Sequence, residues 1–289
     1  MSDEHYFGWV DDQEAVAEIA AQLPIPSFGD TPANLITDIP DKVMPWTIKV
    51  LPCRNQGQVG SCVSFGTARP VEYTHLVEIS KGDKEQFKSL SRETIYGGSR
   101  VEIGGSRFSS DGSTGAWGSQ FVQKYGTLYE QVYGKYDLTT YSVQRCKEWG
   151  RTGVPNDLEP DCAKHKVGTI TKINNAEEAI KAMANGYFIN VCSSRGFELR
   201  RDSEGICRPS GVWQHSMSVI GMKKYGSSRL FCIENSWGPN STTGPLVDLP
   251  HGGCWWVTYE VIDKMFSQGD SWAYSNYEGF PINQINWRF

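Results

Sequence analysis

The stretch Arg54-Asn55-Gln56-Gly57-Gln58-Val59-Gly60-Ser61-Cys62 decides the fold, because it sets an amide and a thiol a few positions apart at the start of a helical pattern. Far downstream, the chain supplies an imidazole at His215 and a second amide at Asn235, which is followed by Ser236-Trp237-Gly238. A thiol becomes a strong nucleophile when it ionises, and a helix N-terminus and a neighbouring imidazolium both favour the thiolate. The sequence therefore predicts a nucleophilic cysteine paired with a histidine.

Each of these polar groups has an expected role. His215 would take the proton from the Cys62 thiol and later act as a general acid. Asn235 would accept a hydrogen bond from the other ring nitrogen of His215 and fix its tautomer, while Trp237 would shield that bond from water. Gln56 would direct its side-chain NH2 at the oxygen that becomes negative when the thiolate attacks a carbonyl, with the Cys62 backbone N–H as second donor. Any one of these residues alone is more often structural, but together and in this order they indicate catalysis.

These motifs resemble the papain family of cysteine peptidases, whose local signature is C-G-[SA]-C-[WY] with His and Asn further along the chain. Here the first string is Val59-Gly60-Ser61-Cys62-Val63, and the second is Ile233-Glu234-Asn235-Ser236-Trp237-Gly238. The resemblance, which covers about residues 38 to 265, implies an α+β, papain-like fold. Its helical left subdomain and β-barrel-like right subdomain would hold the active site in the cleft between them. It also implies a bacterial or bacteriophage-type member, because the long inhibitory propeptide of the family is missing before residue 38.

The resemblance also implies residues that bind the substrate. The segment Asp111-Gly112-Ser113-Thr114-Gly115 resembles the glycine-containing wall along which the family pairs the substrate backbone, so Gly112 and Ser113 are expected to bind substrate. Gln214 precedes the histidine at a position that helps to shape the cleft, and it is neutral where the family often has an acid. A second, modulating ion pair with His215 is therefore not expected from this position.

Cysteine usage departs from the family pattern. Val59 replaces a disulfide-forming cysteine, which fits a reducing compartment, and Val63 replaces the aromatic residue beside the nucleophile. The chain has 8 cysteines, yet it lacks the short paired spacings of a small disulfide-stapled domain. We therefore expect the cysteines other than Cys62 to be mostly buried small hydrophobic residues. Because neither C-x-x-C nor H-E-x-x-H occurs, we expect no metal and no cofactor.

The composition is typical of folded globular proteins. Hydrophobic residues make up 39% and charged residues 21% of the 289 positions. A chain of this length can bury roughly three quarters of its unfolded surface, in about two domains. The net charge is -5 without a basic stripe, which argues against a nucleic-acid partner. Since no long apolar run and no signal-peptide pattern occurs, we expect no membrane partner and a cytoplasmic location, with a virion as the alternative.

Three segments are predicted along the chain. Residues 1–37 form an N-terminal arm with a short helix, residues 38–165 a helical subdomain that carries the nucleophile, and residues 166–289 a β-rich subdomain with His and Asn. The aromatic-rich C-terminal tail from Trp272 to Phe289 is expected to pack onto the protein rather than to serve as a docking peptide.

Local patterns predict individual elements. Asp11 and Glu14 have the spacing of a capping box for the arm helix. The helix that starts at Cys62 should kink or break at Pro70, because proline forfeits the hydrogen bond to the Gly66 carbonyl. Further helices are predicted over 91–96, 113–125 and 176–185, and strands over 167–173, 187–192, 212–220, 230–234 and 255–259.

Three functions are consistent with these motifs. The leading hypothesis is an intracellular, propeptide-less peptidase that hydrolyses peptide bonds through an acyl-enzyme on Cys62. The second is a structural or assembly protein on a papain-like scaffold, for example a component of a phage particle, with protein partners held by the N-terminal arm or the C-terminal tail. The third is a cell-wall peptide hydrolase, although no wall-binding repeat is present. In each case the short arm either blocks the cleft or leaves it open.

Overall fold

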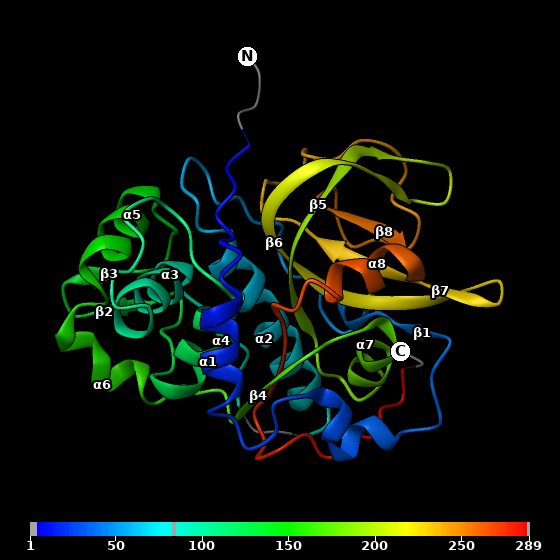
Figure 1. Cartoon of the computed structure of the whole chain (residues 1–289), viewed down its shortest axis with the longest axis horizontal. Helices are drawn as coiled ribbons and strands as arrows, with labels where there is room; N and C mark the ends of the chain where they lie inside the picture. Colours follow the sequence, from blue (N-terminus) through cyan, green and yellow to red (C-terminus); the bar gives the residue numbers. More distant parts are fainter. Residues whose placement is uncertain (1–4, 83–84, 288–289) are drawn as a thin grey trace.

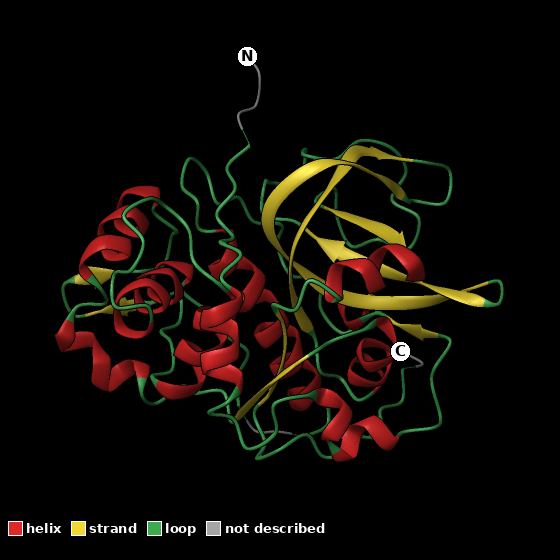
Figure 2. Ribbon diagram, viewed as in Figure 1, coloured by secondary structure: helices red, strands yellow, loops and turns green. Residues whose placement is uncertain are grey.

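The computed structural model describes residues 5–82 and 85–287 of the chain. Helices α3, α4, α5 and α6 gather on one side of the molecule, the large sheet with α7 and α8 lies on the other, and the long helix α2 lies between them (Figure 1 and Figure 2). The described helices are α1 (Gln13–Ala20), α2 (Cys62–Ser80), α3 (Arg92–Gly98), α4 (Gly115–Lys124), α5 (Val143–Thr152), α6 (Glu159–Cys162), α7 (Ala176–Ala184) and α8 (Tyr259–Phe266). Shorter helical turns lie at Phe28–Asp30, Pro32–Leu35, Pro45–Thr47, Ser99–Ile103 and Asn156–Leu158.

The described strands are β1 (Lys42–Val43), β2 (Val132–Tyr133), β3 (Tyr136–Asp137), β4 (Thr169–Lys172), β5 (Ile189–Arg201), β6 (Cys207–Tyr225), β7 (Ser228–Glu234), β8 (Cys254–Thr258) and β9 (Ser271–Ser275). One antiparallel sheet runs in the order β4-β9-β5-β6-β7-β8, with β1 also paired to β6. The long strands β5 and β6 curve over the core in Figure 1. Because β4 and β8 end this order without pairing to each other in the described part of the chain, "barrel-like" describes the sheet only loosely. The α+β expectation is confirmed.

Helix α2 is the central helix of the molecule. It is apolar or buried on nearly every face, which is typical of a helix enclosed by other elements. It runs through Pro70 to Ser80, so of the two predicted outcomes the break is wrong, and a kink at Pro70 stays a prediction. Pro70 has no N–H to donate to the Gly66 carbonyl, and this carbonyl accepts a hydrogen bond from Ser218 Oγ on β6 at 3.4 Å instead. A tertiary donor thus replaces the missing intrahelical one. None of the helices in the described ranges has the length and apolarity needed to cross a membrane.

Helix caps account for most of the predicted helix starts. Asn175 caps α7 by accepting from Glu178 N at 2.9 Å, as its position before the helical pattern indicates. The arm helix differs, because its N-cap is Asp12, which accepts from Ala15 N, and the capping box assigned to Asp11 is wrong. The other predicted helices and strands are found with shifted ends, which is usual for element boundaries.

Cysteines and the C-terminal tail behave largely as expected. All 8 cysteines are free thiols, and all but Cys53 are buried. The tail contributes β9 to the sheet, and Phe280 is buried in the main core, so the tail is packed against the protein. The last two residues of the predicted tail, 288 and 289, and residues 1–4 of the predicted arm lie outside the described residues.

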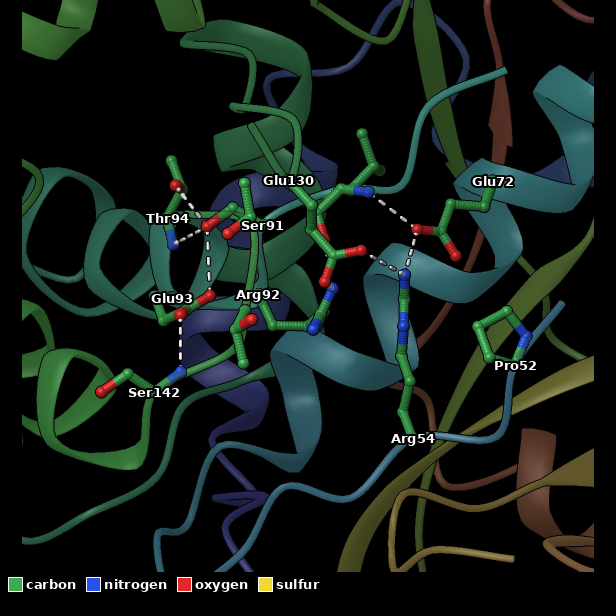
Figure 3. A network of polar contacts seen from close by, with 12 residues as sticks. Pro52, Arg54, Glu72, Ser91, Arg92, Glu93, Thr94, Glu130 and Ser142 are labelled. Carbon is green, nitrogen blue, oxygen red and sulfur yellow. Dashed lines mark hydrogen bonds and ion pairs between the residues drawn. The ribbon is translucent and has the colours of Figure 1, made fainter. Parts of the chain in front are cut away.

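A network of buried charges joins α2 to the loops on either side of it. The Glu72 carboxylate forms ion pairs with Arg54 Nη2 at 2.6 Å and Arg69 Nη1 at 3.1 Å. It also accepts a hydrogen bond from the Leu90 backbone N–H at 2.8 Å. Figure 3 shows Arg54 reaching across to the Glu72 carboxylate, with Glu130 beside it. Arg69 also donates its Nε to Glu234 at 2.7 Å, directly before Asn235. The network therefore ties the loop of Gln56, the helix of Cys62 and the strand of Asn235 into one unit.

Glu72→Gln should weaken this unit. The neutral amide would leave two buried guanidinium groups with less negative charge, so we expect the free energy of unfolding to fall by about 2 kcal/mol. Urea unfolding followed by fluorescence measures the change. Glu148→Gln is the matched control, because Glu148 is exposed on α5 and should shift the free energy by less than about 0.5 kcal/mol. Equal values for the two variants would contradict the prediction.

Candidate active site

Four separate segments bring the predicted catalytic residues together. Gln56 lies in the loop before α2, Cys62 is the first residue of α2, His215 lies within β6, and Asn235 follows the last residue of β7. The Cys62 thiol lies against the backbone N–H of Ser216, the residue after the histidine. The order of the sheet explains this proximity, because β6 pairs with β7 and also packs on α2.

His215 is held by Asn235. The two side chains are joined by a hydrogen bond of 2.8 Å between Nε2 and Oδ1, and both residues are buried. Asn235 Oδ1 also accepts from the Ser236 backbone N–H at 2.7 Å, so it is an acceptor and His215 Nε2 must donate. His215 Nδ1 is buried without a hydrogen-bond partner in the described structure. It is therefore the ring nitrogen left with a free lone pair, and the Trp237 ring lies 4.6 Å away over the same imidazole.

The Gln56 amide is oriented by a residue that the sequence did not single out. Its Oε1 accepts from Ser236 Oγ at 2.6 Å, and the Gln56 backbone N–H donates to the Ser236 carbonyl at 2.8 Å. The side-chain NH2 is therefore turned the other way, where it donates to the Val59 carbonyl at 2.9 Å and to the Tyr6 carbonyl at 3.0 Å. Only the position of Ser236 inside the Asn-Ser-Trp-Gly motif could have indicated this role.

Residues 5–10, here called the occluding segment, run across the predicted catalytic residues. In Figure 1 the dark-blue chain descends between the helical side and the sheet before it enters α1. The Tyr6 carbonyl oxygen takes hydrogen bonds from Gln56 Nε2 at 3.0 Å and from Trp237 Nε1 at 3.3 Å. A main-chain carbonyl thus takes one of the two donors expected for the reacting carbonyl of a substrate, the Gln56 amide, together with the indole N–H of Trp237. Of the two possibilities for the arm, the structure has the blocked one.

The predicted substrate-binding residues also bind this segment. Ser113 N donates to the Gly8 carbonyl at 2.8 Å, and Val10 N donates to the Ser113 carbonyl at 2.9 Å, so that Trp9 and Ser113 form a parallel bridge. Gly112 adopts a φ of 117° and lies so close that an added Cβ would be 2.8 Å from the Gly8 carbonyl oxygen. Only glycine fits this wall.

On the opposite side, the Gln214 carbonyl accepts from the backbone N–H groups of Gly8 and Trp9, each at 3.1 Å. The predicted contribution of Gln214 is therefore made by its main chain, while its side chain is exposed.

Aromatic side chains complete the closure. His5 stacks on Trp237 with ring centroids 4.2 Å apart, and the Phe7 ring meets His215 edge-on at 5.8 Å. Trp9 packs in a small apolar cluster with Cys62. As a result, Cys62 and His215 both have 0% of their surface exposed.

Burial governs the protonation of the pair in this closed state. Burial raises the pKa of the Cys62 thiol to about 12, although nearby backbone N–H groups, including that of Gly8, act in the opposite direction. Burial likewise lowers the pKa of His215 to about 4, and the hydrogen bond that His215 donates to Asn235 acts in the opposite direction. At neutral pH the closed site therefore holds a neutral thiol and a neutral imidazole rather than an ion pair.

Acid should destabilise the closed state. Because the His215 pKa is about 4 when buried and 6.5 by reference, the unfolded chain binds a proton first as the pH falls. We expect the free energy of unfolding to drop by about 2 kcal/mol from this residue between about pH 7.5 and pH 5. Urea unfolding at both pH values measures it. The control is Gly8→Ala, in which displacement of the occluding segment hydrates His215 and should remove most of this drop; an equal drop in both proteins would contradict the account.

Among the described residues, one group has the ligand types for a metal ion. Ligand atoms of Glu234, His251 and Cys254 lie within 4.8 Å of one another. His251 Nδ1 already accepts from Gly253 N at 3.3 Å, and its Nε2 faces Glu234 Oε1 at 3.6 Å. Arg69 Nε forms an ion pair with Glu234 Oε1 at 2.7 Å. Because these groups already interact with one another and with Arg69, we describe them as a polar cluster next to Asn235.

Comparison with known proteins assigns the family. Residues 39–245 match the family described as papain family cysteine protease. A curated relative, the gamete and mating-type specific protein A of Dictyostelium discoideum, is 20% identical over 202 residues, which are 67% of this chain and 39% of that protein. The chain thus spans about two fifths of the length of that relative.

Solved structures share the fold. Xylellain, a cysteine protease from Xylella fastidiosa, superposes with a TM-score of 0.57 at 18% identity, covering 95% of this chain and 93% of its own. Digestive procathepsin L 3 of the Tenebrio molitor larval midgut gives 0.58 at 15% identity, covering 91% and 78%. The bromelain protease from Ananas comosus in complex with the E64 inhibitor gives 0.51 at 15% identity, covering 82% and 99%.

A helical side, a sheet side and a thiol next to a histidine strand at their junction are the architecture of a cysteine peptidase. The chain belongs to the papain family of cysteine proteases, since the matched range 39–245 is well over half of its 289 residues. Its papain-like fold is confirmed by the solved structures.

Proposed function

We propose that this cysteine peptidase hydrolyses peptide bonds through an acyl-enzyme on Cys62 and that the occluding segment keeps it latent. The observation that carries the proposal is the hydrogen bond from Gln56 Nε2 to the Tyr6 carbonyl at 3.0 Å. This bond supports the proposal because it holds a main-chain carbonyl beside the Gln56 amide. A substrate carbonyl would take the same place once residues 5–10 leave.

The chemistry begins with the pair of Cys62 and His215. When the occluding segment leaves, water reaches both groups, and the burial that opposes their charged forms is reduced. His215 Nδ1, which has a free lone pair, takes the thiol proton, and the N-terminus of α2 favours the resulting thiolate. The thiolate attacks the carbonyl, and the imidazolium returns the proton to the leaving amine.

The remaining residues position and stabilise the reacting groups. Gln56 Nε2 and the backbone N–H of Cys62 would donate to the oxygen that becomes negative, where fixed donors need no rearrangement during the reaction. Asn235 keeps the imidazole in the tautomer with a basic Nδ1, and Trp237 covers that hydrogen bond. Ser113 and the Gln214 carbonyl would pair with the backbone of the substrate as they now pair with residues 8–10.

Site-specific alkylation tests the proposal. The protein has 8 free thiols, so the labelled residue must be identified by peptide mapping after treatment with iodoacetamide or an epoxysuccinyl inhibitor. In Gly8→Ala, we expect Cys62 to react faster at pH 6 than free cysteine does, because an ion pair supplies thiolate below the usual thiol pKa. If Cys62 in that variant reacts no faster than free cysteine, the activated pair does not exist.

Ser236→Ala should impair catalysis through Gln56. Without the hydroxyl that binds Oε1 at 2.6 Å, the amide can rotate away from the reacting oxygen. We expect kcat to fall about tenfold with KM nearly unchanged, since the oxygen becomes negative only in the transition state. Steady-state kinetics in the Gly8→Ala background provide the measurement. Ser241→Ala, which removes a hydroxyl bound to Gly238 in the same loop, is the control and should leave both constants unchanged.

A further inference from the structure

The loop from Gln56 to Ser61 carries the groups that would stabilise the reacting oxygen. The Gln56 amide lies at its start, and the Cys62 backbone N–H directly follows its end. Residues 56–61, all of which the structure describes, form neither helix nor strand. No disulfide crosses the loop, because all 8 cysteines are free thiols. The positions of its two ends are therefore set largely by contacts from outside the loop.

Tyr141 bonds to both ends of this loop. Its hydroxyl oxygen lies 2.9 Å from the Gln56 carbonyl oxygen and 3.3 Å from Ser61 Oγ. A carbonyl oxygen can only accept, so the single O–H of Tyr141 donates to Gln56, and Ser61 Oγ donates to Tyr141. Burial raises the pKa of the Tyr141 hydroxyl, which keeps this donor protonated. One phenol thus joins two residues that are five positions apart in the sequence.

The segment around Tyr141 is itself fixed by α2 and α3. The Ser142 backbone N–H donates to the buried carboxylate of Glu93 at 2.9 Å, a bond drawn in Figure 3. The Tyr141 ring meets the Phe65 ring edge-on with centroids 5.1 Å apart, and the Arg92 guanidinium lies 5.5 Å from the centre of the Tyr141 ring. Two helices therefore hold the phenol in place beside the loop.

Apolar packing adds to this support. Val59 is fully buried in an apolar cluster against which Tyr141 and Val143 pack. At Gly57, which has a φ of 64°, an added Cβ would lie 2.7 Å from Val143 Cγ2. The stretch 141–143 thus contacts the loop at its start, in its middle and at its end.

We propose that Tyr141 is a positioning residue of the reaction, which keeps the Gln56 amide and the Cys62 N–H aimed at the same oxygen. The proposal rests on the proposed function, since it concerns the same reaction. Donors that are already in place stabilise the developing negative charge without rearrangement. Without the Tyr141 hydroxyl, the ends of the loop would be free to shift relative to each other. The loss would then fall on the transition state rather than on substrate binding.

Tyr141→Phe tests this role, because it keeps the ring and removes only the hydroxyl. Loss of one oxyanion donor costs about 10²–10³ in turnover, so misdirection of donors that remain should lower kcat by about tenfold with KM nearly unchanged. The kinetics are measured in the Gly8→Ala background. Alkylation of Cys62 by iodoacetamide creates no negative oxygen, so its rate should stay at the Gly8→Ala level. An unchanged kcat, or a fall in alkylation equal to the fall in kcat, would overturn the proposal.

Tyr136→Phe is the matched control. It removes a phenol hydroxyl that donates to Asp157 at 3.0 Å on the surface, and it should change neither kcat nor alkylation. A double-variant cycle shows whether Tyr141 acts through the amide. With Gln56→Ala already present, Tyr141→Phe should lower kcat by no more than about threefold. The same tenfold loss in that background would contradict the positioning role.

A second measurement needs no catalysis. In the full chain, the Gly60 N–H donates to Asp111 Oδ2 at 3.2 Å and the Ser61 N–H to the Val59 carbonyl at 2.8 Å, so hydrogen exchange at both amides reports how firmly the loop is held. We expect Tyr141→Phe to speed their exchange by at least about tenfold relative to the amides of β7, which report any general loss of stability. Equal relative rates in the variant and the wild type would overturn the proposal. If no variant cleaves peptides but exchange in the loop rises, the proposed peptidase function fails while the hold of Tyr141 on the loop stands.

Discussion

Replacing Gly8 with alanine should open the active site. A Cβ at Gly8 would overlap the backbone carbonyl of Gly60, and a backbone atom cannot rotate away as a side chain can. Overpacking of this kind costs about 1–3 kcal/mol, so we expect the population of the open form to rise by about 5- to 150-fold. Alkylation of Cys62 and peptide turnover should both rise by that factor.

The rest of the arm supplies the control for this experiment. Gly29→Ala also adds one methyl group to a glycine of the N-terminal segment, but its nearest neighbour is the flexible carboxylate of Glu178 at 3.1 Å. It should leave alkylation and turnover at the wild-type level. Unchanged alkylation in Gly8→Ala would mean that the closed arrangement tolerates the methyl group and that residues 5–10 are not the barrier to Cys62.

Cys62→Ala should abolish peptide turnover. Removing the nucleophile of a catalytic pair leaves only the contribution of binding and of the oxyanion donors, so we expect kcat to fall by at least about 10⁴. The comparison is made within the Gly8→Ala background, because closure would otherwise mask the loss. Hydrolysis of a mixed peptide library followed by mass spectrometry detects turnover whichever peptide the enzyme prefers.

Cys162→Ala is the matched control for the nucleophile. Cys162 is likewise a buried free thiol, but it lies in α6 within the helical core. Its replacement should leave kcat unchanged even if stability falls. Turnover that survives in Cys62→Ala would assign the reaction to another group and would overturn the mechanism.

The sequence was sufficient for the parts of the site that depend on local motifs. The spacing from Gln56 to Cys62 and the run around Asn235 identified residues that β6, β7 and α2 then bring together. The fold class was predictable for a similar reason, because helical and strand periodicities are local properties of the chain. The path of residues 5–10 was not predictable from the sequence. Main-chain carbonyl and N–H groups hold this segment in place, and these groups do not depend on the side chains that the sequence specifies.

The errors have the same origin. A break at Pro70 follows from local rules, but Ser218 on a distant strand satisfies the Gly66 carbonyl and the helix continues. The role of Ser236 was missed because its partner, Gln56, is far away along the chain and meets it only through the tertiary structure.

Closure of the site also affects how the protein ages. Peroxide and other oxidants attack the thiolate, and the closed molecule holds Cys62 as a buried neutral thiol with a pKa of about 12. We therefore expect the closed molecule to keep Cys62 in its reduced form under oxidising conditions, and the thiol to become vulnerable to sulfenic acid formation when residues 5–10 leave.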